Sequence, residues 1–196
     1  MNYLAHIYLS GNNNDLKIGN FIADSVKGKK FIKYPKGIQD GIILHRAIDT
    51  FTDIHPIFRQ SSKRLFPNFR HYSGVIVDMF YDHFLAANWT EYSEVPLEIY
   101  TAEFYELLEN NWGLLPRRVQ GFYSYMLRDN WLVSYSTIPG LEKILTQMSH
   151  RTVDKIQLNP AIIELKEYYK SFEMEFREFF PEIENFTQQK ITDLNL

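Results

Sequence analysis

Residues 161–180 of this chain read AIIELKEYYKSFEMEFREFF. Large apolar side chains recur in them at spacings of three and four residues: Leu165, Tyr168, Tyr169, Phe172, Phe176, Phe179 and Phe180. This period puts them on one face of an amphipathic α-helix. Pro160 suits the first turn of such a helix and Pro181 its end. The segment therefore predicts a long helix whose apolar face packs into a core.

The same period recurs in segments that proline or glycine separates. The other predicted helices cover residues 15–25, 37–55, 73–89, 96–108, 116–127 and 139–148. Pro56 is expected to stop the helix that precedes it, because proline cannot continue a helical hydrogen-bond ladder. No alternating strand pattern with a hairpin signal occurs. The fold class predicted is all-α, a single-domain helical bundle over residues 1–196.

Length and composition fit one folded domain. The 196 residues are 45% apolar and 16% aromatic, which suits a buried core rather than a disordered chain. Cysteine is absent, so disulfides, thiolate zinc sites and a cysteine nucleophile are excluded. That absence fits a reducing compartment, and we expect a cytoplasmic protein. The net charge of −3 argues against nucleic-acid binding, and no apolar run approaches the ~20 residues of a membrane span.

Two segments place ionisable side chains among large apolar residues. Residues 44–53 read LHRAIDTFTD, and residues 77–84 read VDMFYDHF. Both segments lie inside predicted helices. A buried charge is costly unless it is paired or binds a metal. We therefore expect a polar site inside the helical core, one that holds a divalent cation.

Helix geometry indicates which acidic and imidazole side chains of these segments share a helix face. At about 100° per residue, His45 and Asp49 lie about 40° apart, one turn above the other. Asp78 and Asp82 have the same relation. His83 lies about 100° round the helix from Asp82, so these two can reach one point from either side. Mixed imidazole and carboxylate ligands suit Mn²⁺, Fe²⁺ or Zn²⁺, whereas carboxylates and water alone suit Mg²⁺.

Each candidate also has a structural interpretation. His45 can be a hydrogen-bonded core histidine, and Asp49 a helix cap or the ion-pair partner of Arg46. The Arg46 guanidinium can instead hold phosphate through two parallel hydrogen bonds. Asp24, which follows an apolar run, and His6 can each be a metal ligand or a structural group. The group as a whole indicates a functional site more strongly than any single member.

Residues 27–36 read KGKKFIKYPK, which puts five lysines into ten residues of a net acidic chain. The run can be a solvated loop. It can also be a basic patch that steers an acidic partner towards the site. The candidate partner-binding residues are Lys27, Lys29, Lys30 and Lys33.

Taken in order along the chain, these residues resemble the acyl carrier protein phosphodiesterases of bacteria. The resemblance covers nearly the whole chain, and each motif is weak alone while the ordered set is specific. The residues that carry it are Asn2 to His6, Gly19 to Asp24, Lys27-Gly28, Gly41, Leu44 to Arg46, Ile48-Asp49, Thr52-Asp53, Asp78, Tyr81 to Leu85, Asn88-Trp89, Trp131-Leu132, Tyr135, Met148-Ser149, Arg151 and Phe179 to Pro181.

The resemblance implies hydrolysis of the phosphodiester that joins 4′-phosphopantetheine to a serine of holo-acyl carrier protein, supported by Mn²⁺ or Mg²⁺. It also implies a likeness to HD-type metal-dependent phosphohydrolases, with the ligands in a different chain order, and hence an HD-domain-like bundle. The small acidic carrier protein is the expected partner, docked on the lysine run. Its pantetheine arm would lie in an aromatic groove lined by Tyr81, Trp89 or Trp131.

Residue patterns and resemblance together give each candidate a role. The expected metal ligands are Asp24, His45, Asp82 and His83, with His6 as an alternative. The expected catalytic residues are Arg46, Asp49 and Asp78. The expected cofactor is Mn²⁺, with Mg²⁺ or Fe²⁺ as alternatives. Two other functions stay open: a phosphohydrolase of nucleotides or small phosphoesters, and a non-catalytic helical protein that binds the carrier.

Overall fold

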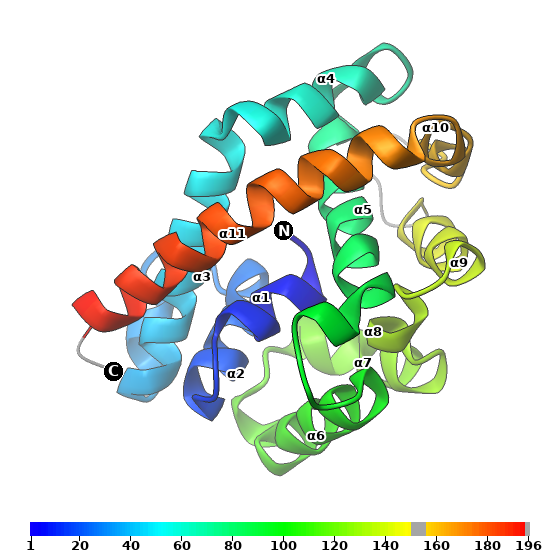
Figure 1. Cartoon of the computed structure of the whole chain (residues 1–196). Helices are drawn as coiled ribbons and strands as arrows, with labels where there is room; N and C mark the ends of the chain where they lie inside the picture. The colour runs from blue at the N-terminus through cyan, green and yellow to red at the C-terminus, as the bar shows by residue number, and fades with distance from the viewer. Residues whose placement is uncertain (150–155, 195–196) are drawn as a thin grey trace.

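Helices are the only regular elements in the residues that the computed structural model describes, 1–149 and 156–194 (Figure 1). In chain order they are α1 (Tyr3–Leu9), α2 (Asn14–Ile22), η1 (Ala23–Ser25), η2 (Gly28–Lys33), α3 (Lys36–Ile54), α4 (Pro56–Phe69), η3 (Arg70–Tyr72), α5 (Ser73–Ala87), η4 (Trp89–Glu91), α6 (Leu97–Asn110), η5 (Trp112–Leu114), α7 (Arg117–Arg128), α8 (Trp131–Ser134), α9 (Ile138–Ser149), α10 (Ala161–Glu167) and α11 (Tyr169–Asp193). The all-α prediction is confirmed. Arg151, one of the residues that carry the resemblance, lies outside the described residues.

The short helix α1 lies in the middle of the arrangement, and the long helix α11 crosses over it (Figure 1). α1 packs against α2, α5 and α11, while α11 also contacts α3 and α4. Buried apolar side chains from all these helices join one continuous core. Among the described helices, none combines the length and the apolar composition needed to cross a lipid bilayer.

The predicted end of the last helix is wrong, because α11 continues through Pro181. Packing beyond the proline outweighs the hydrogen bond that its missing N–H removes. Ile183 is fully buried, and the Phe186 ring stacks on Phe51 of α3 with centroids 4.5 Å apart. The break lies earlier than predicted, at Tyr168, which separates α10 from α11.

Three α-helices have no counterpart in the sequence prediction: α1, α4 and the four-residue α8. α1 has only seven residues, too few for a periodic pattern to be distinctive. α4 begins at Pro56, the residue expected to stop the preceding helix. Pro56 therefore follows the end of α3, as predicted, and also begins α4, because proline is well suited to the first position of a helix.

Helices α2 and α3 approach closely at a pair of glycines. A Cβ added to Gly19 would lie 2.8 Å from the Gly41 Cα and closer still to the Ile38 carbonyl oxygen. Only glycine therefore fits at this crossing. The contact matters for the site because it brings Asn20 and Asp24, which follow Gly19 along the chain, against α3.

We expect Gly19→Ala to lower the free energy of unfolding by about 1–3 kcal/mol, because the added methyl group must push the two backbones apart. Gly121→Ala is the matched control, since a Cβ there meets no atom within 4 Å in the middle of α7. That control should be neutral or stabilising by about 0.5–1 kcal/mol. Urea denaturation measures both, and equal effects would contradict the close-approach argument.

Candidate metal centre

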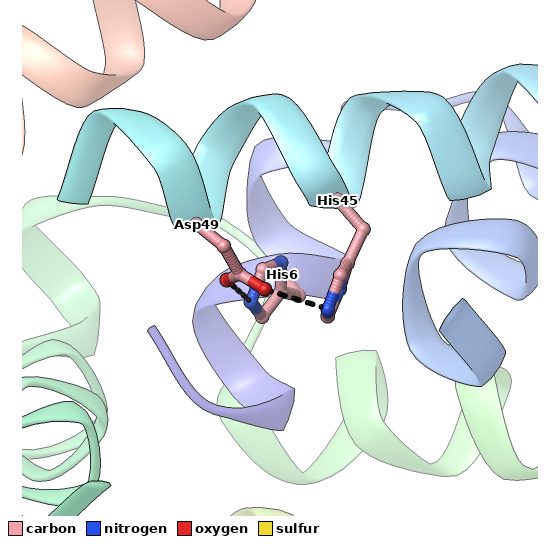
Figure 2. A group of neighbouring side chains, drawn as sticks. All are labelled: His6, His45 and Asp49. Carbon is pink, nitrogen blue, oxygen red and sulfur yellow. Dashed lines mark ion pairs between the residues drawn. The ribbon is translucent and has the colours of Figure 1, made fainter. Parts of the chain in front are cut away.

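Helix α3 carries two candidate residues on one face, as their spacing predicts. Asp49 Oδ2 lies 3.0 Å from His45 Nε2 one turn away. His6 reaches the same point from α1, with its Nε2 3.2 Å from Asp49 Oδ1. Figure 2 shows the carboxylate joined by dashed lines to both imidazoles. One ligand atom from each residue lies within 4.8 Å of the other two, a spacing that one metal ion can bridge.

The orientation of the His45 ring is fixed by Asn20 of α2. The Asn20 amide nitrogen donates to the His6 carbonyl oxygen (2.8 Å) and to Ser10 Oγ (2.9 Å). Its amide oxygen therefore faces His45 Nδ1, 3.1 Å away, and accepts a hydrogen bond from it. With Nδ1 protonated, the Nε2 atom that faces Asp49 is the nitrogen that would bind a metal, once the metal displaces its proton. Sequence reasoning gave Asn20 no role, although a buried amide in an apolar run needs partners.

Asp24 approaches the same nitrogen from η1, with its Oδ1 3.3 Å from His45 Nε2. Burial opposes protonation of His45, but hydrogen bonds to Asp24 and Asp49 outweigh it and raise the pKa of His45 to about 9. The same bond from His45 is the main cause that lowers the pKa of Asp24. Burial alone would raise the pKa of Asp49, yet the two histidines hold it well below its ordinary value. Both carboxylates are therefore ionised.

His6 is the group that suits a metal best. Burial, followed by the charge of His45, lowers the pKa of His6 to about 4, so its ring is neutral. The two imidazoles stack with centroids 4.1 Å apart. His6 Nδ1 has no hydrogen-bond partner, while Nε2 faces the Asp49 carboxylate at 3.2 Å. Buried nitrogens without partners are rare, and a neutral imidazole is a ready ligand for a cation. The residues present therefore fit a divalent metal.

Asp82, a predicted ligand, lies outside this group and makes other bonds. It is fully buried and accepts backbone N–H groups from Leu4 (2.7 Å), Ala5 (3.2 Å) and Asn2 (3.3 Å). Burial raises the pKa of Asp82 to about 7 against the effect of these donors. The carboxylate thus caps the start of α1, and through α1 it positions His6.

His83, also a predicted ligand, points away from the group. Its Nδ1 donates to the Tyr135 carbonyl oxygen at 2.7 Å, and its Nε2 accepts from the Tyr169 hydroxyl at 3.1 Å. Burial lowers its pKa, so the ring is neutral and both nitrogens are in use. The difference from the prediction has a simple cause: residues 82 and 83 face different sides of α5. Periodicity could not tell which side faces α3.

Asp78 lies one turn from Asp82 and borders an open cleft together with Asp24. The Met1 amino group donates to Asp78 Oδ1 at 2.7 Å. Burial raises the pKa of Asp78 more than this ammonium lowers it, and the Asp49 and Asp53 carboxylates add to the rise. Asp78 is thus a neighbour of the group formed by His6, His45 and Asp49 rather than a member.

The Arg46 guanidinium binds the segment that carries the lysine run. It donates to the carbonyl oxygens of Val26 (3.1 Å) and Gly28 (2.8 Å), and it lies over the Phe31 ring at 5.0 Å. These contacts attach η2 to α3 and leave the four candidate lysines exposed. In the structure the guanidinium therefore binds backbone carbonyl oxygens, a role that neither the predicted phosphate contact nor the alternative ion pair with an aspartate anticipates.

The predicted aromatic groove is wrong. Tyr81, Trp89 and Trp131 are all buried in the core and cannot line an open groove. Tyr81 instead shares a hydrogen bond with Ser61 (2.9 Å), and Trp89 donates to the Val95 carbonyl oxygen (2.7 Å).

Fold and site together define a class: an all-helical protein in which two buried histidines and one half-buried carboxylate form a group that can hold a divalent cation. Comparison with known proteins is more specific. The sequence profile of the family described as acyl carrier protein phosphodiesterase matches residues 1–183. This chain therefore belongs to the acyl carrier protein phosphodiesterase family.

Three relatives are named acyl carrier protein phosphodiesterase. The protein from Pectobacterium atrosepticum is 30% identical over 182 residues, which cover 92% of this chain and 94% of the relative. That from Photorhabdus laumondii is 30% identical, with 92% of each chain covered. That from Yersinia pestis is 27% identical over 97% of this chain and 99% of its own. No solved structure matches this chain.

Proposed function

We propose that this protein hydrolyses the phosphodiester between 4′-phosphopantetheine and a serine of acyl carrier protein, releasing apo-carrier and free 4′-phosphopantetheine. The bond from phosphorus to the serine oxygen breaks, and a water oxygen takes its place on phosphorus. One water proton ends on the serine oxygen. Family membership over nearly the whole chain supports this substrate. The observation that carries the chemistry is the group of His6, His45 and Asp49, in which both imidazoles are buried and His6 Nδ1 has no hydrogen-bond partner.

His6, His45 and Asp49 would hold the metal, with Asp24 beside His45. We propose Mn²⁺, with Mg²⁺ or Fe²⁺ as alternatives, because nitrogen and oxygen ligands occur together. A divalent cation there would neutralise phosphoryl oxygens and lower the pKa of an attacking water. A two-histidine, one-carboxylate group in a helical core also supports kinship with HD-type phosphohydrolases. Asp78, which shares the cleft with Asp24, is our candidate for proton transfer to the serine oxygen.

The deciding assay incubates the purified protein with holo-acyl carrier protein and Mn²⁺. Mass spectrometry should show the carrier losing the phosphopantetheine mass, and a chelator should abolish that loss. Holo-carrier that keeps its full mass with Mn²⁺, Mg²⁺ and Fe²⁺ in turn would contradict the proposal. Hydrolysis of small phosphodiesters without any action on the carrier would favour a small-molecule phosphohydrolase instead.

We also propose that the exposed lysines of η2 and its flank dock the acidic carrier. Reversing Lys29, Lys30 and Lys33 to Glu is expected to raise KM for holo-carrier about tenfold or more, and to weaken the dependence of kcat/KM on salt. The matched control reverses three other lysines to Glu: Lys63, Lys166 and Lys170, which are exposed on α4, α10 and α11. Equal KM values for the two variants would contradict the proposal that these lysines dock the carrier.

A further inference from the structure

A cleft of about 330 Å³ opens beside the metal centre, on the side of Asp24 and Asp78. Its described walls come from segments far apart in the chain: the start of α1, η1, η3, the first turns of α5, the start of α7, the end of α9, and Leu158 before α10. The apolar part of the wall comprises Val75, Met148 and Leu158, beside the tyrosines Tyr3 and Tyr72. Its volume is at the lower end of the range for small-molecule sites.

The cleft meets the metal centre through Asp24. The Asp24 carboxylate lines the cleft and also lies 3.3 Å from His45 Nε2. An elongated ligand in the cleft can therefore present one end to the metal centre while the rest lies along the apolar wall. The wall combines apolar side chains with tyrosines and carboxylates, so it suits a narrow chain that alternates apolar groups and amides.

Among the described residues, Arg118 is the arginine that lines this cleft, and it is exposed. Arg118 lies at the second position of α7, and the other ionisable side chains in the described wall are Asp24 and Asp78, the latter paired with the Met1 amino group. Guanidinium recognises phosphate by two parallel hydrogen bonds. The other arginine near the site, Arg46, already uses its guanidinium on two backbone carbonyls. Arg118 is therefore the better placed phosphate ligand.

We propose that this cleft is the binding site for the phosphopantetheine arm, with Arg118 on the phosphate and Val75 against the apolar part of the arm. The inference rests on the proposed function and deepens it. It assigns the arm a binding site, which the buried residues Tyr81, Trp89 and Trp131 cannot form. A ligand of the same chemistry, a phosphorylated amide chain without carrier protein, should bind on its own.

The test measures binding of free 4′-phosphopantetheine as well as turnover. Val75 is 38% exposed on the cleft wall, so Val75→Trp should fill the cleft without disturbing the core. We expect Val75→Trp and Arg118→Glu each to raise Kd for 4′-phosphopantetheine, and KM for holo-carrier, by about tenfold or more. Calorimetry gives Kd, and circular dichroism verifies the fold.

Matched controls lie close by. Arg117→Glu makes the same charge change at the neighbouring exposed residue, which does not line the cleft. Val95→Trp adds the same bulk at a valine that is 41% exposed elsewhere. Both controls should retain the wild-type Kd and KM. If Val75→Trp is folded and also keeps both values, the arm does not bind in this cleft.

The two proposals fail in different ways. In the first case the wild-type protein binds 4′-phosphopantetheine, and Val75→Trp abolishes this binding, but the wild-type protein does not cleave holo-carrier. This result contradicts the proposed function and supports the binding site. Wild-type protein that cleaves holo-carrier, while Val75→Trp cleaves it equally well, contradicts only the binding site. Wild-type protein that shows no affinity for 4′-phosphopantetheine overturns the binding site.

Discussion

His45→Ala is expected to lower kcat/KM for holo-acyl carrier protein at least about 10³-fold, which corresponds to the several kcal/mol that a catalytic metal supplies. His45 is the member of the group with the most contacts. Its ring stacks on His6, its Nδ1 is held by Asn20, and its Nε2 faces Asp49 and Asp24. Removing the ring would take away one proposed ligand, together with the contacts that hold His6 and Asp49 in place. Metal analysis should show stoichiometric Mn²⁺ in the wild-type protein and little in the variant.

His55→Ala is the matched control for this loss. His55 is also buried, follows the last turn of the same helix, and pairs with a carboxylate, Glu182, at 3.2 Å. The His55→Ala substitution therefore removes a similar set of contacts from the fold without changing the proposed metal centre. We expect its kcat/KM and bound metal to stay close to the wild-type values. If His45→Ala is folded and turns over holo-carrier as His55→Ala does, the reaction takes place elsewhere.

The part of this site that could be predicted from sequence is the part that lies within one helix. A separation of four residues fixes His45 and Asp49 on one face, whatever the helix packs against. Which partner meets that face depends on tertiary packing. Asp82 and His83 have suitable chemistry, but one caps α1 and the other bonds to Tyr135 and Tyr169. The residue that the structure brings in is His6, the least constrained of the predicted ligands.

The fold shows the same division between local and long-range information. Long periodic segments such as α3, α5 and α7 are predictable because many side chains repeat the same period. The continuation of α11 through Pro181 is not, because it depends on contacts such as Phe186 with Phe51 of a distant helix. The Gly19–Gly41 crossing is likewise invisible locally, although it sets how closely Asp24 approaches His45.

The second large effect concerns Glu175, which interrupts the apolar face of α11. Its side chain is buried and accepts hydrogen bonds from both terminal nitrogens of Arg64 (2.7 and 2.5 Å), from Gln60 (2.8 Å) and from Ser61 (2.5 Å). Ser61 also bonds to the Tyr81 hydroxyl of α5. One carboxylate therefore joins α11 to α4 and, through Ser61, to α5.

Glu175→Gln is expected to lower the free energy of unfolding by about 2–4 kcal/mol, because it leaves the Arg64 guanidinium without its counter-charge. For a chain of this size the melting temperature should fall by roughly 5–15 °C. Glu178→Gln, at an exposed position on the same helix, removes the same charge and should change stability little. Equal losses in the two variants would mean that the network does not stabilise the fold.

The pH dependence separates this ion pair from a simple packing effect. Burial alone would raise the pKa of Glu175, but the hydrogen bonds from Arg64, Ser61 and Gln60 outweigh it and keep the pKa below the ordinary value of 4.5. A carboxylate whose folded pKa is lowered stabilises the fold fully above its unfolded pKa, and this contribution is lost as the pH falls through the folded pKa. The stability difference between wild type and Glu175→Gln should therefore be constant at neutral pH and shrink in acid, as urea denaturation across the pH range will measure. A difference that stays the same in acid would assign the loss to packing, not to the charge of Glu175.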